Sequence, residues 1–365
     1  MSKTVVLAYS GGLDTTICLH WLQQKGYNII ILLAQLGQHQ YLEPDGEKAL
    51  NVGATDVHIL DLRQRFIKDY IWPTLKANAK YESGYLLSSA LTRPLIAEEL
   101  VRIARDENCS IVAHGARGIG NEHIRFENSI LTLDPKIKII APLKELGLNS
   151  VNDDVEYAHK NNLPLERIKY TFYNIEENLW GINIHLGLLP RMLSGTGKKE
   201  ITPPTGGADT YLITTPILET SDTPIILEIT FKQGEPTHLD AKKMDSLELI
   251  NLLSKIGGRT AIGRWEMIEN KISGEKTLEV YEAPAATILY RAHQALEELV
   301  LDKELMHYKN SLSQKYAELV YDGYWFSPLK NALDKFFEYT QQSITGSVKM
   351  KLLKGNMTVI GRKIG

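Results

Sequence analysis

The chain has little of several features that would point to a particular class of protein. Only two cysteines, Cys18 and Cys109, occur in 365 residues, which argues against a disulfide framework and favours a reducing, cytoplasmic setting. The net charge is −3, so we expect no surface for nucleic acid or for an anionic membrane. No apolar run is as long as a membrane span, and because the first apolar segment has the pattern of a strand, we expect no signal peptide. The histidines form no H-x-x-x-H pair, so no histidine-rich zinc site is predicted.

The sequence does have a globular composition and enough length for two domains. Hydrophobic residues make up 43% of it and charged residues 23%, as in soluble globular proteins. In the first part, apolar runs alternate with amphipathic stretches, which predicts a parallel sheet with helices on both faces. The runs are residues 5–8, 29–34, 57–60, 111–113 and 137–141, and helical patterns cover residues 85–105 and 153–161. Ligands of such sheets bind at the carboxyl ends of strands, where Ser10, Gln35, His114 and Gly115 should line one crevice.

The pattern changes after about residue 165, which predicts a boundary between domains 1–165 and 166–365. Residues 191–209 are rich in Gly, Thr, Lys and Pro and are predicted to form a loop. The G-T-G-K run at residues 195–198 has the composition of a phosphate loop, but no strand precedes it. Strands are predicted at residues 211–215, 225–232, 347–353 and 356–361, and helices at 246–256, 286–302 and 328–342. The second domain is therefore predicted to be α+β.

The most informative pattern lies at the beginning of the chain. Residues 4–16 read T-V-V-L-A-Y-S-G-G-L-D-T-T, which predicts a strand, a glycine turn and the N-terminus of a helix. Such a turn binds anions, because glycine lets the backbone approach a phosphate, and the free N–H groups and helix dipole attract it. Asp14, in the first helical turn, is a candidate to hold a magnesium ion beside that anion. The loop has neither a Walker A ending nor G-x-G-x-x-G spacing, and S-G-G-x-D-T resembles the pyrophosphate-binding loop of ATP pyrophosphatases.

Separated motifs along nearly the whole chain resemble those of one family, the argininosuccinate synthases. The motifs are A-Y-S-G-G-L-D-T-T (8–16), R-P-L-I-A (93–97), H-G-x-x-G-x-G-N (114–121), R-F-E (125–127), E-N-L-W-G (177–181), I-G-G-R (256–259), V-Y-E-A-P (280–284), Y-A-E-L-V (316–320) and W-F-S-P-L (325–329). The resemblance implies an α/β fold, with a parallel-sheet nucleotide-binding domain of the adenine nucleotide alpha hydrolase type followed by an α+β synthetase domain that also serves oligomerisation.

The resemblance also implies a reaction. In the family, the ureido oxygen of citrulline attacks the α-phosphate of ATP, and the amine of aspartate then displaces AMP to give argininosuccinate. Little side-chain acid–base chemistry is required, so positioning and charge stabilisation carry most of the rate. ATP is the implied co-substrate, and Mg²⁺ is inferred from the ATP chemistry rather than from a set of protein ligands.

The implied site residues fall into two sets. Those for ATP are Ala8, Tyr9, Ser10, Gly11, Gly12, Leu13, Asp14, Thr15, Thr16, Ala34 and Gly115, with Ser10, Asp14 and Arg93 as the catalytic candidates. Those for the amino-acid substrates are Tyr85, Arg117, Asn121, Glu122, Arg125, Asn174, Asn183, Glu269 and Tyr281. Among them, Arg125 can pair with a carboxylate through two N–H groups, and Glu269 can accept from an ammonium group.

The sequence departs from the family at the amino-acid sites while the ATP loop is intact. Arg117 replaces a threonine that relatives use for the aspartate carboxylate, and Glu122 replaces an aspartate. Asn174 and Asn183 replace two serines of the citrulline site, and His185 replaces a glutamate. Gln35 stands where relatives have Asp or Asn, and residues 276–279 read K-T-L-E in place of the family's K-S-R-G. Arg117 is expected to bind an anionic group of the amine substrate, unless its side chain points into solvent.

Three functions therefore stay open. The chain is a citrulline–aspartate ligase, a paralogue with the same adenylation chemistry and other substrates, or a non-catalytic ATP-binding homologue. Glutamine amidotransferases and sulfur-inserting tRNA enzymes share the S-G-G loop, but they need reactive cysteines that this sequence does not present in a suitable motif. The sequence ends before the C-terminal segment that helps relatives form tetramers, so a dimer is expected, with a tetramer as the alternative.

Overall fold

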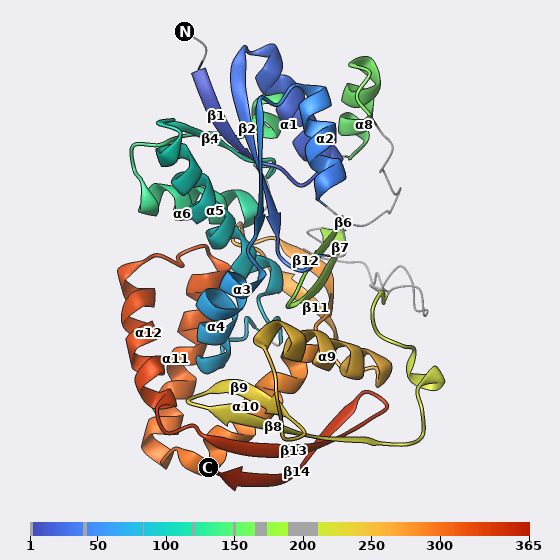
Figure 1. Cartoon of the computed structure of the whole chain (residues 1–365), viewed down its shortest axis with the longest axis vertical. Helices are drawn as coiled ribbons and strands as arrows, with labels where there is room; N and C mark the ends of the chain where they lie inside the picture. Colours follow the sequence, from blue (N-terminus) through green and yellow to red (C-terminus); the bar gives the residue numbers. More distant parts are fainter. Residues whose placement is uncertain are drawn as a thin grey trace, which may run out of the picture. The chain divides into compact units, whose positions relative to one another are not determined.

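A computed structural model of the chain describes residues 3–38, 42–82, 84–118, 121–148, 151–164, 174–188 and 211–365 (Figure 1). Contacts divide the chain into two compact units. The first comprises Met1–Leu62, Thr92–Phe172 and Asp322–Ser327, and the second comprises Arg63–Leu91, Tyr173–Tyr321 and Pro328–Gly365. Within the described part of the chain, no helix combines the length and the apolar character needed to cross a membrane.

These units differ from the single boundary predicted near residue 165. Residues 63–91 belong to the second unit because they bond to it: the Tyr290 hydroxyl donates to the carbonyl oxygens of Thr74 and Ala79, at 3.2 and 2.8 Å. Residues 322–327 belong to the first unit, where Gly323 lies so close to Arg125 that a Cβ on it would be 2.7 Å from the Arg125 Cα. Tertiary packing, rather than chain order, places both segments.

The first unit is built on a parallel sheet of five strands in the order β3-β2-β1-β4-β5. The strands are β1 (Lys3–Ala8), β2 (Tyr27–Gln35), β3 (Asp56–Asp61), β4 (Ile111–Ala113) and β5 (Lys138–Ile140). The predicted parallel sheet is confirmed, and each predicted apolar run overlaps one strand, although the run at residues 137–141 extends one residue beyond β5 at each end. The strand order reverses between β1 and β4, which is where sheets of this kind bind ligands.

Helices cover both faces of this sheet because alternate side chains of each strand point to opposite faces. Val5 and Leu7 of β1 belong to a core cluster with Ile17 and Leu22, whereas Val6 belongs to a second cluster. The first cluster takes in α1 (Leu13–Gln24), α2 (Glu43–Val52), α7 (Pro142–Leu146) and α8 (Val151–Lys160). The second takes in α5 (Ser88–Asp106) and α6 (Asn121–Leu133) (Figure 1).

The second unit has two antiparallel sheets, in the orders β11-β12-β7-β6 and β10-β9-β8-β13-β14. Their strands are β6 (Asn174–Asn178), β7 (Gly181–Leu188), β8 (Ile225–Lys232), β9 (Glu235–Leu239), β10 (Lys242–Lys243), β11 (Arg264–Asn270), β12 (Lys276–Glu282), β13 (Gly346–Leu353) and β14 (Asn356–Ile364). The longer helices are α9 (Ser246–Arg259), α10 (Pro284–Val300), α11 (Lys303–Tyr321) and α12 (Pro328–Gln341), and α3 (Arg63–Phe66) and α4 (Trp72–Lys76) flank the π-helical turn Ile67–Ile71. The predicted α+β class is confirmed.

One predicted strand is wrong. Residues 211–215 form no strand and residues 212–214 form bends, because the backbone N–H groups of 212–214 bond to a side chain and not to a neighbouring strand. The buried Glu282 carboxylate accepts from the N–H groups of Leu212, Ile213 and Thr214, at 2.5–3.2 Å. The predicted loop at residues 191–209, with its G-T-G-K run, lies outside the described residues.

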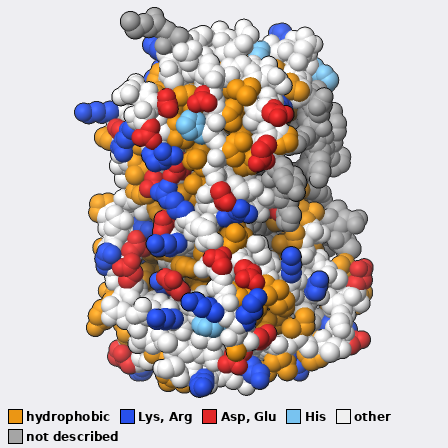
Figure 2. Space-filling view, in the orientation of Figure 1, with side chains coloured by type: hydrophobic (Ala, Val, Ile, Leu, Met, Phe, Trp, Pro, Cys, Tyr) orange, Lys and Arg blue, Asp and Glu red, His pale blue; other side chains and the backbone are white. Residues whose placement is uncertain are grey.

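The surface agrees with the charge balance of the sequence. Figure 2 shows Lys and Arg side chains interspersed with Asp and Glu side chains over the face in view. The chain has 41 basic and 44 acidic residues.

Candidate active site

The glycine turn after β1 has the geometry of an anion-binding loop. Gly11 has a φ of +75°, and a Cβ there would overlap the carboxyl group of Asp45. Only glycine therefore fits both the backbone conformation and the space. Lys48 Nζ donates to the carbonyl oxygen of Gly11 at 3.0 Å. The sequence analysis missed Asp45 and Lys48, because no motif marks these two residues of α2.

Hydroxyl groups brace the same loop. Ser10 Oγ lies 3.1 Å from Thr15 Oγ1, which also accepts from the Ser10 N–H at 3.2 Å. Thr16 Oγ1 donates to the Gly12 carbonyl oxygen at 2.8 Å and lies 3.1 Å from the Tyr9 hydroxyl. Gly12 is the N-cap of α1 and provides no side-chain cap. The N–H groups of the first turn, including those of Leu13 and Asp14, thus lie at the positive end of a twelve-residue helix.

The loop after β4 packs directly against this helix end. A Cβ at Gly115 would lie 2.8 Å from Thr15 Cγ2, so glycine is required where the two loops meet. Ala34, near the end of β2, accepts from Gln38 Nε2 at 2.8 Å. Gln35 turns back onto its own loop, where its Oε1 accepts from the Gly37 N–H at 3.1 Å.

Arg117 is held by two carboxylates and does not point into solvent. Its Nη2 donates to Asp14 Oδ1 at 3.0 Å, and its two terminal nitrogens donate to the carboxylate of Asp154 on α8. The Arg117 side chain is 19% exposed and the Asp154 side chain is fully buried. Burial raises the pKa of Asp154 to about 6 although Arg117 acts to lower it. The sequence analysis missed Asp154, which lies 37 residues further along the chain.

This arrangement bears on the predicted magnesium ligand. Asp14 Oδ1 already accepts from a guanidinium group, and a positive charge at that place disfavours a second cation. Asp14 as it stands therefore does not fit a direct magnesium ligand, and no step of the reaction is assigned to a protein-bound magnesium ion.

The remaining predicted residues of the first unit lie on α5 and α6. Asn121 and Arg125 are buried, and Arg125 Nη1 lies 3.4 Å from Glu122 Oε1. The Arg125 guanidinium group, which is predicted to bind a substrate carboxylate, thus lies beside the Glu122 carboxylate of the same helix. Arg93, on α5, donates through Nη1 to Thr92 Oγ1 at 2.8 Å.

Four predicted substrate residues come together in the second unit. The Tyr85 and Tyr281 rings stack with centroids 4.3 Å apart. The Tyr281 hydroxyl donates to Glu269, and Asn183 Nδ2 donates to the Tyr85 hydroxyl at 3.1 Å. Burial, with Glu269 beside it, raises the pKa of Tyr281. Asn174 begins β6, and its side chain lies outside the described part of the structure.

A charged cluster extends from Glu269, and one of its members, Lys271, was missed by the sequence analysis. Lys271 Nζ lies 3.1 Å from Glu269 Oε1 and 2.9 Å from Glu279 Oε1. Glu279 pairs with His185 across β12 and β7, and His185 Nδ1 lies 2.6 Å from Glu279 Oε2. Burial alone would raise the pKa of Glu279, but His185 and Lys271 hold it below its usual value. The departures from the family at residues 185 and 279 thus form one ion pair. The sequence does not reveal this pair, because it depends on the register between β7 and β12.

Comparisons with known proteins agree with this architecture. A family model described as the arginosuccinate synthase N-terminal HUP domain matches residues 4–164, and one described as the arginosuccinate synthase C-terminal domain matches residues 173–364. The chain belongs to the argininosuccinate synthase family.

Its curated relatives carry that name. The argininosuccinate synthase of Chlorobium phaeobacteroides is 45% identical over 99% of this chain and 87% of its own length. Those of Chlorobium luteolum and Chlorobaculum tepidum are 44% and 43% identical, again over 99% of this chain and 88% of their own length.

Among solved structures, a 4-thiouridine synthetase–RNA complex with bound ATP matches 43% of this chain and 40% of its own, with 18% identity and a TM-score of 0.31, which is too low to support an argument. The family is one of C–N ligases that use ATP, so the chain is an enzyme of that class.

The fit of Gly11 can be tested by substitution. We expect Gly11→Ala to weaken ATP binding, measured by titration calorimetry, by about tenfold or more, because strain at positive φ and the collision with Asp45 displace the loop. Gly26→Ala is the matched control, because Gly26 has a φ of +76° and a Cβ added to it would have no atom within 4 Å. Equal ATP affinity in the two variants would contradict this assignment.

The pairing of Arg117 with Asp154 predicts a pH-dependent loss of stability. The folded-state pKa of Asp154, about 6, exceeds its ordinary value of 3.8, so its ionisation lowers stability as the pH rises between these values. Arg117→Thr leaves this buried carboxylate without its main partner, which should cost about 3 kcal/mol of unfolding free energy at pH 8 and clearly less at pH 5, where Asp154 is protonated. Urea denaturation at the two pH values measures this.

Asp154→Asn serves as the companion variant. Arg117→Thr combined with Asp154→Asn should recover most of the loss at pH 8, because no buried charge remains. An equal loss at both pH values, or no recovery in the double variant, would show that Asp154 does not carry the effect.

Proposed function

We propose that the chain is an AMP-forming ligase that activates a ureido oxygen with ATP and joins the activated carbon to an amine. In the first step the ureido oxygen attacks the α-phosphorus, so that an O–P bond forms and pyrophosphate leaves. In the second, the amine nitrogen attacks the ureido carbon and loses a proton, a C–N bond forms and AMP leaves. The observation that carries the proposal is the uncapped N-terminus of α1 behind Ser10, Gly11 and Gly12, in a chain that matches both domains of the family.

The residues of this loop have a role that follows from electrostatics. The backbone N–H groups at the start of α1 and the helix dipole would stabilise the charge that develops on the leaving pyrophosphate. Ser10 and Thr15 hold the loop in shape, and Arg93 is a further candidate to contact a phosphate. Mg²⁺ would arrive with the ATP phosphates, and its chemistry there is neutralisation of their charge.

Citrulline and aspartate are the first substrates to propose, because they are those of the family. Tyr85, Asn183, Glu269 and Tyr281 form one connected group, which suits recognition of a single small polar ligand. On this proposal, Glu269 accepts from the citrulline ammonium group. Arg125 and Asn121 are separate candidates to bind a substrate carboxylate.

A specific observation favours a second candidate, in which the chemistry is the same but the ureido substrate has no α-ammonium group. Lys271 places its own ammonium group 3.1 Å from Glu269, at the carboxylate that a citrulline ammonium group would need. Arg117 likewise adds a charge where the family has a neutral threonine. The change at Arg117 alters the charge of a predicted substrate residue and leaves the ATP loop intact.

The reaction itself is tested by pyrophosphate release from the purified chain with ATP, Mg²⁺, citrulline and aspartate, each amino acid also being omitted in turn. We expect release that depends on the ureido compound, and a C–N product only when the amine is present. ATP binding without release for any ureido compound would overturn the proposal in favour of a non-catalytic homologue.

The two substrate candidates are separated by comparing citrulline with 5-ureidopentanoate, which is citrulline without its α-amine. If Glu269 binds the ammonium group, citrulline should have a kcat/KM about tenfold or more higher, since a charge-assisted hydrogen bond contributes about 1.5–3 kcal/mol. If the Lys271 ammonium group is instead paired with the Glu269 carboxylate, 5-ureidopentanoate should have a kcat/KM at least as high as that of citrulline. Lys271→Met should then shift the ratio toward citrulline, whereas Lys243→Met, a change at an exposed residue of β10, should not.

A further inference from the structure

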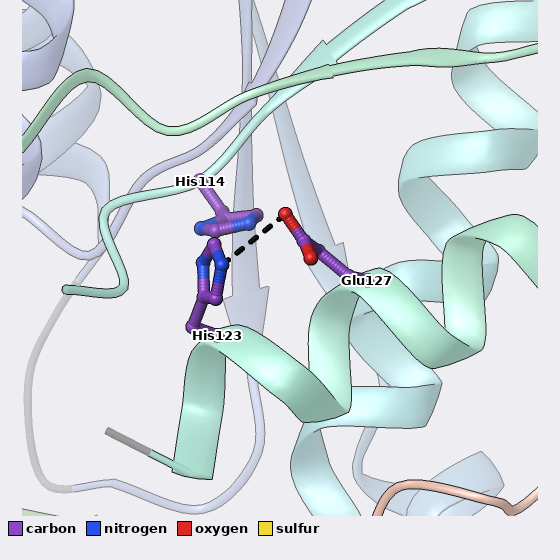
Figure 3. A group of neighbouring side chains, drawn as sticks. All are labelled: His114, His123 and Glu127. Atoms are coloured by element: carbon purple, nitrogen blue, oxygen red, sulfur yellow. Dashed lines mark ion pairs between the residues drawn. The ribbon is translucent and has the colours of Figure 1, made fainter. Parts of the chain in front are cut away.

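A group of three side chains in the first unit has the composition of a transition-metal site. Figure 3 shows His114, at the end of β4, and His123 and Glu127, from successive turns of α6, pointing toward one another. One ligand atom of each lies within 4.8 Å of the others, and His123 Nε2 is 3.2 Å from Glu127 Oε1. Residues four apart on a helix share a face, which explains how His123 and Glu127 form a pair.

Two ring nitrogens in this group lack the partners that buried polar atoms normally have. The His114 side chain has no exposed surface, and its Nε2 has no hydrogen-bond partner within the described part of the chain; the same is true of His123 Nδ1. Unpartnered buried nitrogen atoms are rare and call for an explanation. Burial lowers the pKa of His114 to about 3 and lowers that of His123, so both rings are neutral at pH 7 and have a lone pair to give.

The group already attracts a cation. Lys144 Nζ lies 3.1 Å from His123 Nε2, on the atom that also faces Glu127. When the lone pair of His123 is on Nε2, that nitrogen and Glu127 Oε1 are two acceptors side by side. A positive charge, here that of Lys144, relieves the repulsion between them. Lys144 is exposed, so its flexible side chain can leave when a more strongly bound cation enters.

From this arrangement we infer that His114, His123 and Glu127 bind a divalent transition-metal ion of the Zn²⁺ type. Two imidazoles and a carboxylate are a common ligand set for zinc, and water completes the coordination. Tetrahedral ligands at about 2.1 Å from zinc lie about 3.4 Å apart. Ligand atoms that are up to 4.8 Å apart must therefore approach by up to about 1.4 Å, mainly through side-chain rotation.

Binding has one local consequence. His114 Nδ1 accepts from the Ala116 N–H at 3.2 Å, which places the ring proton on Nε2. To ligate through Nε2, His114 must carry its proton on Nδ1 instead, and Ala116 then loses its acceptor. Metal binding would thus change the hydrogen bonding of the loop that carries Gly115 and Arg117. This change couples the new site to the loop beside α1.

The test is metal binding by the full chain, measured without reference to catalysis. Protein stripped with a chelator is titrated with Zn²⁺ by calorimetry and with Co²⁺ by visible absorption. We expect one ion per chain and Co²⁺ bands in the visible range that are typical of nitrogen and oxygen ligands. His123→Gln and Glu127→Gln should each weaken Zn²⁺ binding by at least about 10–100-fold, the range seen when even outer-shell partners of a metal are removed.

Two further variants make the result specific. Lys144→Met should strengthen Zn²⁺ binding, because it removes the competing ammonium group, whereas His307→Gln, a change at an exposed histidine of α11, should leave it unchanged. Thermal unfolding checks that each variant is folded. No saturable Zn²⁺ binding by the wild-type chain, or binding that survives both His123→Gln and Glu127→Gln in folded protein, would overturn the inference.

Discussion

The close approach of two loops at the carboxyl end of the parallel sheet is the constraint on which the first unit depends. Between β1 and α1, only a residue without a Cβ can lie against Asp45 at a positive φ, and Gly11 is that residue. Gly115 is needed for its small size alone, where the loop after β4 contacts Thr15. Because β1 and β4 are neighbours at the point where strand order reverses, these two glycines bring the N-terminus of α1, His114 and Arg117 into one small region.

Two buried carboxylates at the candidate sites are each paired with basic side chains of their own unit. Asp154 has Arg117, and Glu279 has His185 and Lys271. Removing one member of such a pair is strongly destabilising, whereas exchanging both together is tolerated. This explains how changes at residues 185 and 279 coexist: the two residues face each other across β7 and β12, and a glutamate at 279 is acceptable where a basic group can reach it.

The departures from the family therefore have a physical description. Relatives with 43–45% identity over 99% of the chain place it within the argininosuccinate synthase family, and the sequence of its glycine loop resembles that family's ATP loop. Among the departures, Arg117 brings a positive charge to the Asp14 carboxylate. Lys271, which is not one of the departures noted in the sequence, pairs with Glu269. Charge at a small polar site changes ligand preference more than shape does, because a misplaced charge must be desolvated without compensation.

The sequence by itself determined the parallel sheet, the glycine turn and most of the strands, because these follow from local periodicity and from backbone conformations that only glycine adopts readily. It also indicated that Tyr85, Asn183, Glu269 and Tyr281 belong to one site. Tertiary structure decided the rest: which unit takes residues 63–91, why residues 211–215 bend toward Glu282, that Arg117 lies between Asp14 and Asp154, and that His114 meets His123 and Glu127. Each of these depends on contacts between residues distant in sequence, or on the side chains that surround a buried charge, and neither leaves a periodic pattern in the chain.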